Sequence, residues 1–138
     1  MTRRRVKPIV QQNADPVTAG GGLRPDRIFI KPGGDMTEKI FRMEDLVAYQ
    51  DGSIVSKEIV KKPTGTITLF AFDRDQGLSE HTAPFDALVA MLDGEAEIAI
   101  SGEPHRLKKG DMIVMPGGKP HALKAIQRFK MMLVMIRS

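Results

Sequence analysis

The sequence predicts an all-β domain of the sandwich or barrel type, preceded by a largely irregular arm. From residue 53 onward, short apolar or alternating runs recur, each bounded by turn residues such as Gly, Pro and Asp. No stretch has the length and period of a long helix. With 138 residues, 41% of them hydrophobic, the chain has enough material for one domain with its own core.

Residues 1–35 are predicted to be a flexible basic arm and residues 36–138 the folded domain. Gly and Pro interrupt the arm, as in "TAGGGLRPD", and only "DRIFI" (residues 26–30) is expected to pair as a strand. The arm carries the whole formal charge of +4, because residues 36–138 hold fourteen basic and fourteen acidic residues. Met36 follows the arm directly, so the mass of the protein from its native source would show whether a shorter product starts there.

Composition narrows the classes of function. The folded part has no basic stripe and the chain has one tyrosine and no tryptophan, so we expect no nucleic-acid partner. No apolar run approaches the ~20 residues of a membrane-spanning helix. The polar "QQNADP" stands where a signal peptide would have its apolar core, so we expect a cytoplasmic protein without a membrane partner. The absence of cysteine excludes disulfides, thiolate metal sites and cysteine nucleophiles.

The expected elements begin with a helical turn over residues 43–49. Strands are expected within "SIVSKEIV" (53–60), "GTITLFAF" (65–72), "DALVAML" (86–92), "EAEIAI" (95–100), "HRL" (105–107), "DMIVM" (111–115), "HALKAI" (121–126) and "FKMMLVMI" (129–136). Asp93 and Gly94 separate two of these runs and predict a hairpin, because glycine accepts the positive φ that such turns need.

The alternation of side chains within the strands predicts a second subunit. In "EAEIAI" the carboxylates Glu95 and Glu97 point one way and the apolar residues the other, as in a strand with one wet face. "DALVAML" and "KMMLVMI" are apolar on both faces and need cover on both. In a barrel this small, we expect a second copy of the chain to supply the outer cover, which predicts a homodimer.

The stretch "GDMIVMPGGKPHALKA" resembles the second motif of the cupin family, G-x5-P-x-G-x2-H-x3-N. Gly110, Pro116, Gly118 and His121 match it, and Ala125 replaces the final Asn. The resemblance covers roughly residues 44–137. It implies a double-sheet jelly-roll β-barrel that is open at one end.

The first cupin motif, G-x5-H-x-H-x3,4-E-x6-G, is matched less completely. His81 takes the first histidine position and Gly94 closes the motif, with 15 residues between Gly94 and Gly110 as in short, prokaryote-like cupins. Ala83 stands at the second histidine position and Ala87 at the glutamate position, while the opening glycine is displaced to Gly77. Two of the four ligands that metal-bearing cupins use are therefore replaced.

His81 and His121 leave a metal site short of ligands, because catalytic zinc sites have three protein ligands and structural ones four. Asp86 or Glu80 is a candidate third ligand for iron, manganese, nickel or zinc. Strand alternation points both carboxylates outward, although a bulge near Pro84 would reverse the facing of Asp86. We therefore expect no tightly bound metal, with one divalent ion on His81, His121 and Asp86 as the alternative.

The two histidines also predict a small-molecule site. Inward alternation places apolar residues behind them, which either fill the core or line a pocket. His105 matches no ligand position and is interpreted as a surface residue. The predicted pocket residues are His81, Phe85, Val89, Met91, Met115, His121, Met131 and Leu133.

Three functions remain open for the predicted barrel. The first is binding of a small molecule in the apolar pocket marked by the two histidines, with the ligand and reaction unassigned. The second is a metal-dependent cupin enzyme of the oxygenase, isomerase or decarboxylase type. The third is a structural or protein-interaction role for a fully packed barrel. No hydrolase elbow, phosphate loop, dinucleotide fingerprint or zinc-protease motif is present in the sequence.

Overall fold

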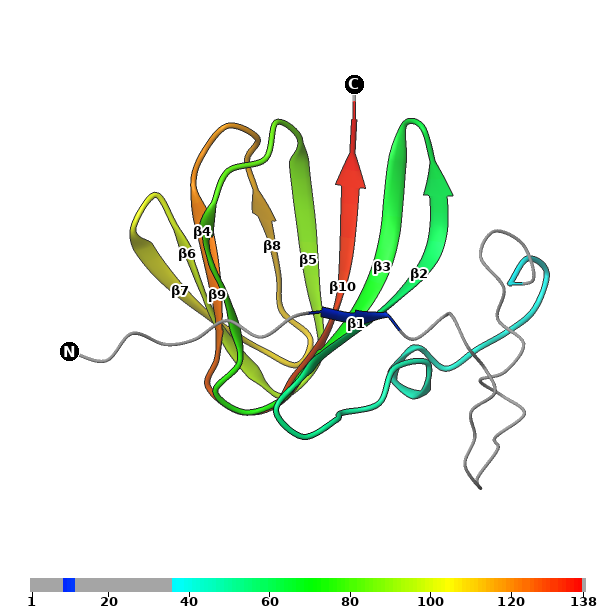
Figure 1. The fold of residues 1–138 in the computed structure, drawn as a ribbon. Helices are drawn as coiled ribbons and strands as arrows, with labels where there is room; N and C mark the ends of the chain where they lie inside the picture. Colours follow the sequence, from blue (N-terminus) through cyan, green and yellow to red (C-terminus); the bar gives the residue numbers. More distant parts are fainter. Residues whose placement is uncertain (1–8, 12–35, 138) are drawn as a thin grey trace.

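The computed structural model describes residues 9–11 and 36–137, and nearly all regular structure among them is β-strand. Figure 1 shows the strands as two facing layers. The strands are β1 (Ile9–Gln11), β2 (Ile54–Lys62), β3 (Gly65–Phe72), β4 (Gly77–His81), β5 (Asp86–Asp93), β6 (Glu95–Ile100), β7 (Glu103–Lys108), β8 (Met112–Met115), β9 (His121–Ala125) and β10 (Phe129–Ile136). One short 3-10 helix, η1 (Met43–Asp45), precedes β2.

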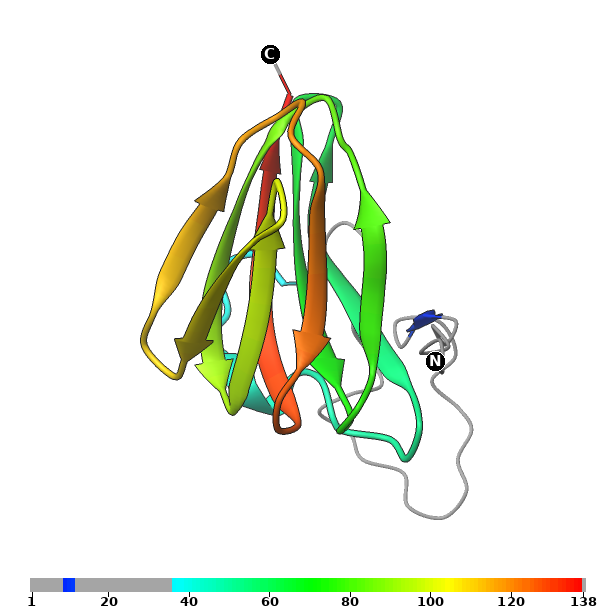
Figure 2. The same ribbon diagram turned by 90° about the vertical axis from the view of Figure 1, so that its left-hand side faces the viewer.

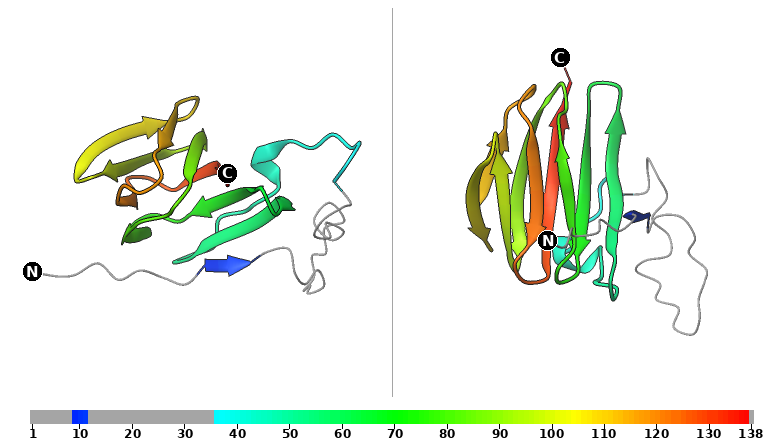
Figure 3. Two further views of the ribbon diagram at one scale, coloured as in Figure 1. Left: turned by 90° about the horizontal axis from the view of Figure 1, so that it is seen from above. Right: turned by 60° about the vertical axis from the view of Figure 1, so that its left-hand side comes forward.

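The larger sheet has six strands in the order β1-β2-β3-β10-β5-β8, and the smaller has four in the order β4-β9-β6-β7. Every pairing is antiparallel except that of β1 with β2. Figure 2 places the smaller sheet in front, and the view from above in Figure 3 shows the two layers edge-on. The predicted all-β, double-sheet jelly-roll barrel is therefore confirmed.

The core lies between the two sheets and is built from alternate residues of each strand. Phe72 and Phe129 are register partners on β3 and β10, and their rings stack with centroids 4.4 Å apart. Ile54, the neighbour of Phe72 on β2, is also fully buried. From the smaller sheet, Ala96 and Ile98 face this cluster while Glu97 points away, as the alternation of "EAEIAI" predicts.

A second apolar cluster covers part of the outer face of the six-stranded sheet. Leu46 and Val47, which follow η1, pack against outward-facing residues of β2 and β3. The Tyr49 hydroxyl donates a 2.7 Å hydrogen bond to Asp93 Oδ2, and Lys130 Nζ donates one of 2.6 Å to the carbonyl oxygen of Glu44. The helical turn predicted over 43–49 is thus one 3-10 turn followed by a segment tied to the barrel.

Two strands differ from the sequence predictions. Residues Ile9–Gln11 pair in parallel with Ile54–Ser56 at the edge of the larger sheet, so "DRIFI" is not the only part of the arm able to pair. "DRIFI" itself lies outside the described residues. The polar segment Gly77–His81 forms β4, which the apolar pattern missed because Ser79, Glu80 and His81 are exposed. Within the described ranges, no helix is long and apolar enough to cross a membrane.

Gly94 is predicted to be the most sensitive turn glycine. Its φ is +76°, and a Cβ there would lie 1.8 Å from the carbonyl oxygen of Arg128. Gly102 has a similar φ of +83° with nothing within 4 Å of its Cβ position. Gly94→Ala should therefore lower the free energy of unfolding by at least ~2 kcal/mol more than Gly102→Ala does. Urea titration of both variants measures the difference, and equal losses would contradict the close contact.

Candidate functional site

The candidate site is a pair of histidines at one end of the barrel. His81 ends β4 and His121 begins β9, and the two are register partners. Their ring centroids lie 4.4 Å apart with an angle of 73° between the planes. A register shift between Leu78 and His81 precedes the pair, so an irregular ladder brings the two rings together.

Backbone carbonyls fix the tautomer of both rings. His81 Nδ1 lies 2.8 Å from the carbonyl oxygen of Ser79, and His121 Nδ1 lies 3.2 Å from that of Lys119. A carbonyl oxygen can only accept a hydrogen bond, so each neutral ring carries its proton on Nδ1. Both Nε2 atoms therefore retain a lone pair, and the pair of rings offers two acceptors or two metal ligands.

The two rings differ in their exposure. The His121 ring is buried, with 5% of the residue exposed, whereas His81 is exposed. Burial first, and then the neighbouring His81, lower the pKa of His121, while its contact with the Lys119 carbonyl opposes them. Since an unperturbed histidine has a pKa of about 6.5, His121 is neutral at pH 7.

The predicted pocket residues differ in burial. Val89, Met91, Met115 and Met131 are buried in the core between the sheets. Other apolar residues that pack against this core are only partly buried: Leu78, Ile100, Leu133 and Met135. Phe85 is also partly buried, and the Arg137 guanidinium carbon lies 5.0 Å from its ring centroid. Part of the apolar surface around the core is therefore accessible to solvent.

Polar residues that the sequence analysis did not select share this inner face. Glu58 on β2 and Thr68 on β3 lie in the same cross-strand row as Leu133 on β10. The alternation of "GTITLF" was the signal that could have revealed Thr68. His105 is half-buried and pairs with Ile98 on the inner face, so its interpretation as a surface residue was wrong.

Asp86 lies on the outer face of β5, where it anchors a loop. Its neighbour Ala87 is buried, whereas Asp86 is exposed and its Oδ1 accepts a 2.8 Å hydrogen bond from Gly117 N. In the same loop, Gly118 N donates to the carbonyl oxygen of Ala83 at 2.8 Å. These contacts hold the loop of residues 116–120, which leads directly into His121.

The donor set at the histidine pair is incomplete for a metal ion. No group of three or more His, Asp or Glu side chains within residues 36–137 is placed to hold one. Two Nε2 atoms without a third protein donor do not fit the ligand sets of catalytic or structural zinc sites. A metal on His81, His121 and Asp86 stays a prediction, and Glu80 is an exposed residue of β4.

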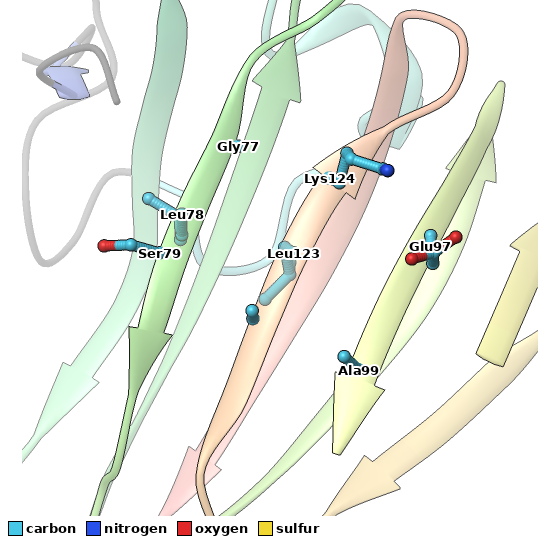
Figure 4. A pocket seen from close by; sticks show the side chains of 8 residues that line it. Gly77, Leu78, Ser79, Glu97, Ala99, Leu123 and Lys124 are labelled. Carbon is cyan, nitrogen blue, oxygen red and sulfur yellow. The ribbon is translucent and has the colours of Figure 1, made fainter. Parts of the chain in front are cut away.

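A separate hollow of about 270 Å³ lies over the smaller sheet (Figure 4). Small residues of β4, β6 and β9, among them Gly77, Ala99 and Ala122, form part of its lining. Glu97 and Lys124 are register partners beside it, and Figure 4 labels both at its edge. This hollow does not include the histidine pair.

The sequence and the fold agree with one family. Residues 69–137 match the sequence model of the cupin domain. The chain belongs to the cupin family. The resemblance seen in "GDMIVMPGGKPHALKA" is thereby confirmed, and the histidine pair lies at the two cupin ligand positions that this chain retains.

Three similar proteins illustrate the likeness. A conserved protein of unknown function from Streptococcus pyogenes is 37% identical, with 73% of this chain and 89% of that chain covered and a TM-score of 0.71. A cupin 2 conserved barrel domain protein from Leptotrichia buccalis is 41% identical over 70% of this chain and 47% of its own, with a TM-score of 0.69. An uncharacterized protein of Aquifex aeolicus (strain VF5) is 28% identical over 98 residues, 70% of this chain and 81% of that protein.

The protonation of His121 is predicted to depend on its neighbour. In wild-type protein, the His121 ring should titrate below the usual value of about 6.5, since burial and His81 both lower its pKa. His81→Gln should raise the pKa without restoring the usual value, because burial, the larger cause, remains. As the pH falls, the unfolded chain binds a proton at this histidine before the folded protein does. The free energy of unfolding should therefore decrease as the pH drops below about 6.5. NMR titration of the ring protons measures this, and a midpoint at or above about 6.5 would contradict the burial of His121.

Asp86 is predicted to act as a loop anchor through its oxygen rather than its charge. Asp86→Ala leaves Gly117 N without this acceptor and should lower the free energy of unfolding by about 0.5–1 kcal/mol. Asp86→Asn retains an amide oxygen that accepts the same hydrogen bond and should cost less. Denaturant unfolding of the two variants distinguishes them, and equal losses would show that the hydrogen bond to Gly117 does not stabilise the loop.

Proposed function

We propose that this cupin binds a small molecule at the open end of its barrel, against His81 and His121. The observation that carries the proposal is the pair of rings 4.4 Å apart, both with Nδ1 directed to a backbone carbonyl and Nε2 left to accept. Enzymatic turnover is not part of the proposal, since the arrangement selects no reaction.

The chemistry of the open end favours a ligand with an apolar body and a proton-donating group. Leu133 and Met135 offer partly exposed apolar surface next to a sealed core. Both imidazoles present acceptors, and Glu58 adds a carboxylate on the same inner face. A hydroxyl or ammonium group on the ligand can donate hydrogen bonds to these acceptors. A ligand carboxylate has no proton to donate, so its oxygens would face the lone pairs of the acceptors without forming hydrogen bonds.

A metal-dependent cupin enzyme is the second candidate, and the two free Nε2 atoms favour it. They supply two ligands of a mononuclear site, and iron, manganese, nickel or zinc accepts imidazole ligands. Such an ion would need further donors from the bound molecule or from water, because the described residues offer no third protein ligand at the pair. The ion would supply Lewis acidity, while the chain's own rings would hold and orient it.

Ligand binding is tested by NMR with simple probes. Benzyl alcohol and benzylamine carry an apolar ring and a donor, and toluene has the ring alone. The two donors should shift the His81 and His121 ring resonances saturably and more strongly than toluene does. His121→Ala should abolish the donor preference, and His105→Ala, which removes the histidine outside the pair, should keep it. Equal responses to all three probes would contradict the role of the imidazoles.

The same proteins test the metal alternative. Wild type, His121→Ala and His105→Ala would be incubated with Fe²⁺, Mn²⁺, Ni²⁺ or Zn²⁺, desalted and analysed for metal content. Near-stoichiometric metal in wild type and His105→Ala, lost in His121→Ala, would favour the metal-dependent function. Equal traces in all three proteins would favour the organic ligand. The expected cytoplasmic location and the expected lack of a nucleic-acid partner stay predictions.

A further inference from the structure

Arg137, which directly follows β10, lies on the inner side of the larger sheet. Along β10, Met135 packs against the core while Ile136 is 62% exposed, so alternation returns the next residue to the inner side. The register of Ile136 with Asp86 sets Arg137 beside Phe85. The Arg137 guanidinium carbon indeed lies 5.0 Å from the centroid of the Phe85 ring, which agrees with this placement.

Phe85 belongs to the same end of the barrel as the histidine pair. It follows His81 by four residues, in the connection between β4 and β5. The connection between β8 and β9 lies against it: Gly118 N donates to the carbonyl oxygen of Ala83 at 2.8 Å, and a Cβ on Gly117 would lie 2.9 Å from the carbonyl carbon of Phe85. Figures 1 and 2 show both connections and the end of β10 at one end of the molecule.

The guanidinium group of Arg137 has no acidic partner among the residues that the structure describes. Arg137 is exposed and no described carboxylate forms an ion pair with it, whereas Arg128 contacts Asp73 at 3.3 Å. An arginine that stacks on an aromatic ring keeps the N–H donors at its edge available. Phe85 therefore holds a fork of hydrogen-bond donors that is free to bind an anion.

Charge is ordered along the inner face of the larger sheet. Lys61 shares a cross-strand row with Met135, and Glu58 shares the next deeper row with Leu133. Successive inward rows lie two residues, or about 7 Å, apart along a strand. Positive charge at Arg137 and Lys61 thus lies at the end of the sheet, and the carboxylate of Glu58 lies deeper.

We infer that Arg137 binds a carboxylate on the ligand of the proposed site and so selects the class of that ligand. This inference rests on the function proposed for His81 and His121. The ligand is a carboxylic acid with an apolar body and a hydroxyl group at its far end. The hydroxyl donates to the imidazole acceptors, the body lies along Phe85, and the carboxylate accepts two hydrogen bonds from the guanidinium.

Arg137 suits this role better than the lysines at the same end. Lys61 and Lys119 are exposed, and neither forms an ion pair or a ring contact within residues 36–137. A lysine is a point charge on a flexible stem, whereas the planar guanidinium matches both oxygens of a carboxylate. Four residues of chain span at most about 14 Å, so a ligand with one ring and a short chain is of the right order of length.

Two probes that differ only in charge test the inference. These are 3-(4-hydroxyphenyl)propionate and its neutral amide, titrated at one salt concentration while NMR follows the histidine ring resonances. Wild type should bind the acid about tenfold more tightly than the amide. Arg137→Gln should bind the two equally, and Arg137→Lys should keep part of the preference. Arg106→Gln, which removes the same charge from the outer face of the smaller sheet, should keep all of it.

The amide separates this inference from the function on which it rests. If wild type binds acid and amide equally, or Arg137→Gln keeps the preference, the inference is overturned and ligand binding at the histidines stands. If neither probe shifts the histidine resonances, both fail.

The Arg137 Nε–H resonance of wild type gives a direct measurement that needs no variant. It should move on binding of the acid and stay in place with the amide. If it stays fixed while the acid binds more tightly, another cation holds the carboxylate and the inference fails. Circular dichroism of each variant verifies that it is folded.

Discussion

The structure depends on the need to bury both faces of the six-stranded sheet. Its inner face carries Phe72, Phe129 and Met131, which pack against the smaller sheet and exclude water. Its outer face is also apolar. Burial of each exposed aliphatic side chain on that face would stabilise the protein by about 1.5–3 kcal/mol. The chain covers part of that face with its own residues 36–49, fastened by Tyr49 and Lys130. The two-sided sheet therefore links the core and the segment of residues 36–49.

Much of this fold could be predicted from the sequence, because a strand alternates its side chains with period two. "EAEIAI" predicted one wet and one dry face, and the structure buries Ala96 and Ile98 and leaves Glu97 outside. The turn at Asp93 and Gly94 has the predicted positive φ, +76° at Gly94, but the predicted hairpin was wrong because β5 and β6 belong to different sheets. The mostly polar β4 has no alternation of apolar and polar residues that would have predicted it. β1 was not predictable either, because its three residues form a strand only by pairing with the edge of β2.

The candidate site was only partly predictable for a physical reason. His81 and His121 were found through motif positions, since no short-range pattern relates residues 40 apart in the chain. Their edge-to-face contact depends on the register of β4 with β9 and on the irregularity before His81. The partner of Asp86 was not predictable either, because Gly117 approaches it only when the loop of residues 116–120 is in place. Alternation correctly placed Asp86 outward, but what it contacts is a matter of tertiary structure.

The difference in burial among the side chains inside the barrel has a consequence for how the protein can change. At the end of the stacked Phe72 and Phe129, inward residues are sealed, so a substitution there leaves a cavity and costs several kcal/mol. Near His121, Leu133 and Met135 are only partly buried and tolerate changes of shape more readily. Under the proposed function, stability and recognition depend on different side chains of one barrel. Substitutions at the partly exposed side chains would then alter the ligand preference without unfolding the protein, and descendants of one sequence could diverge in function while keeping the same fold.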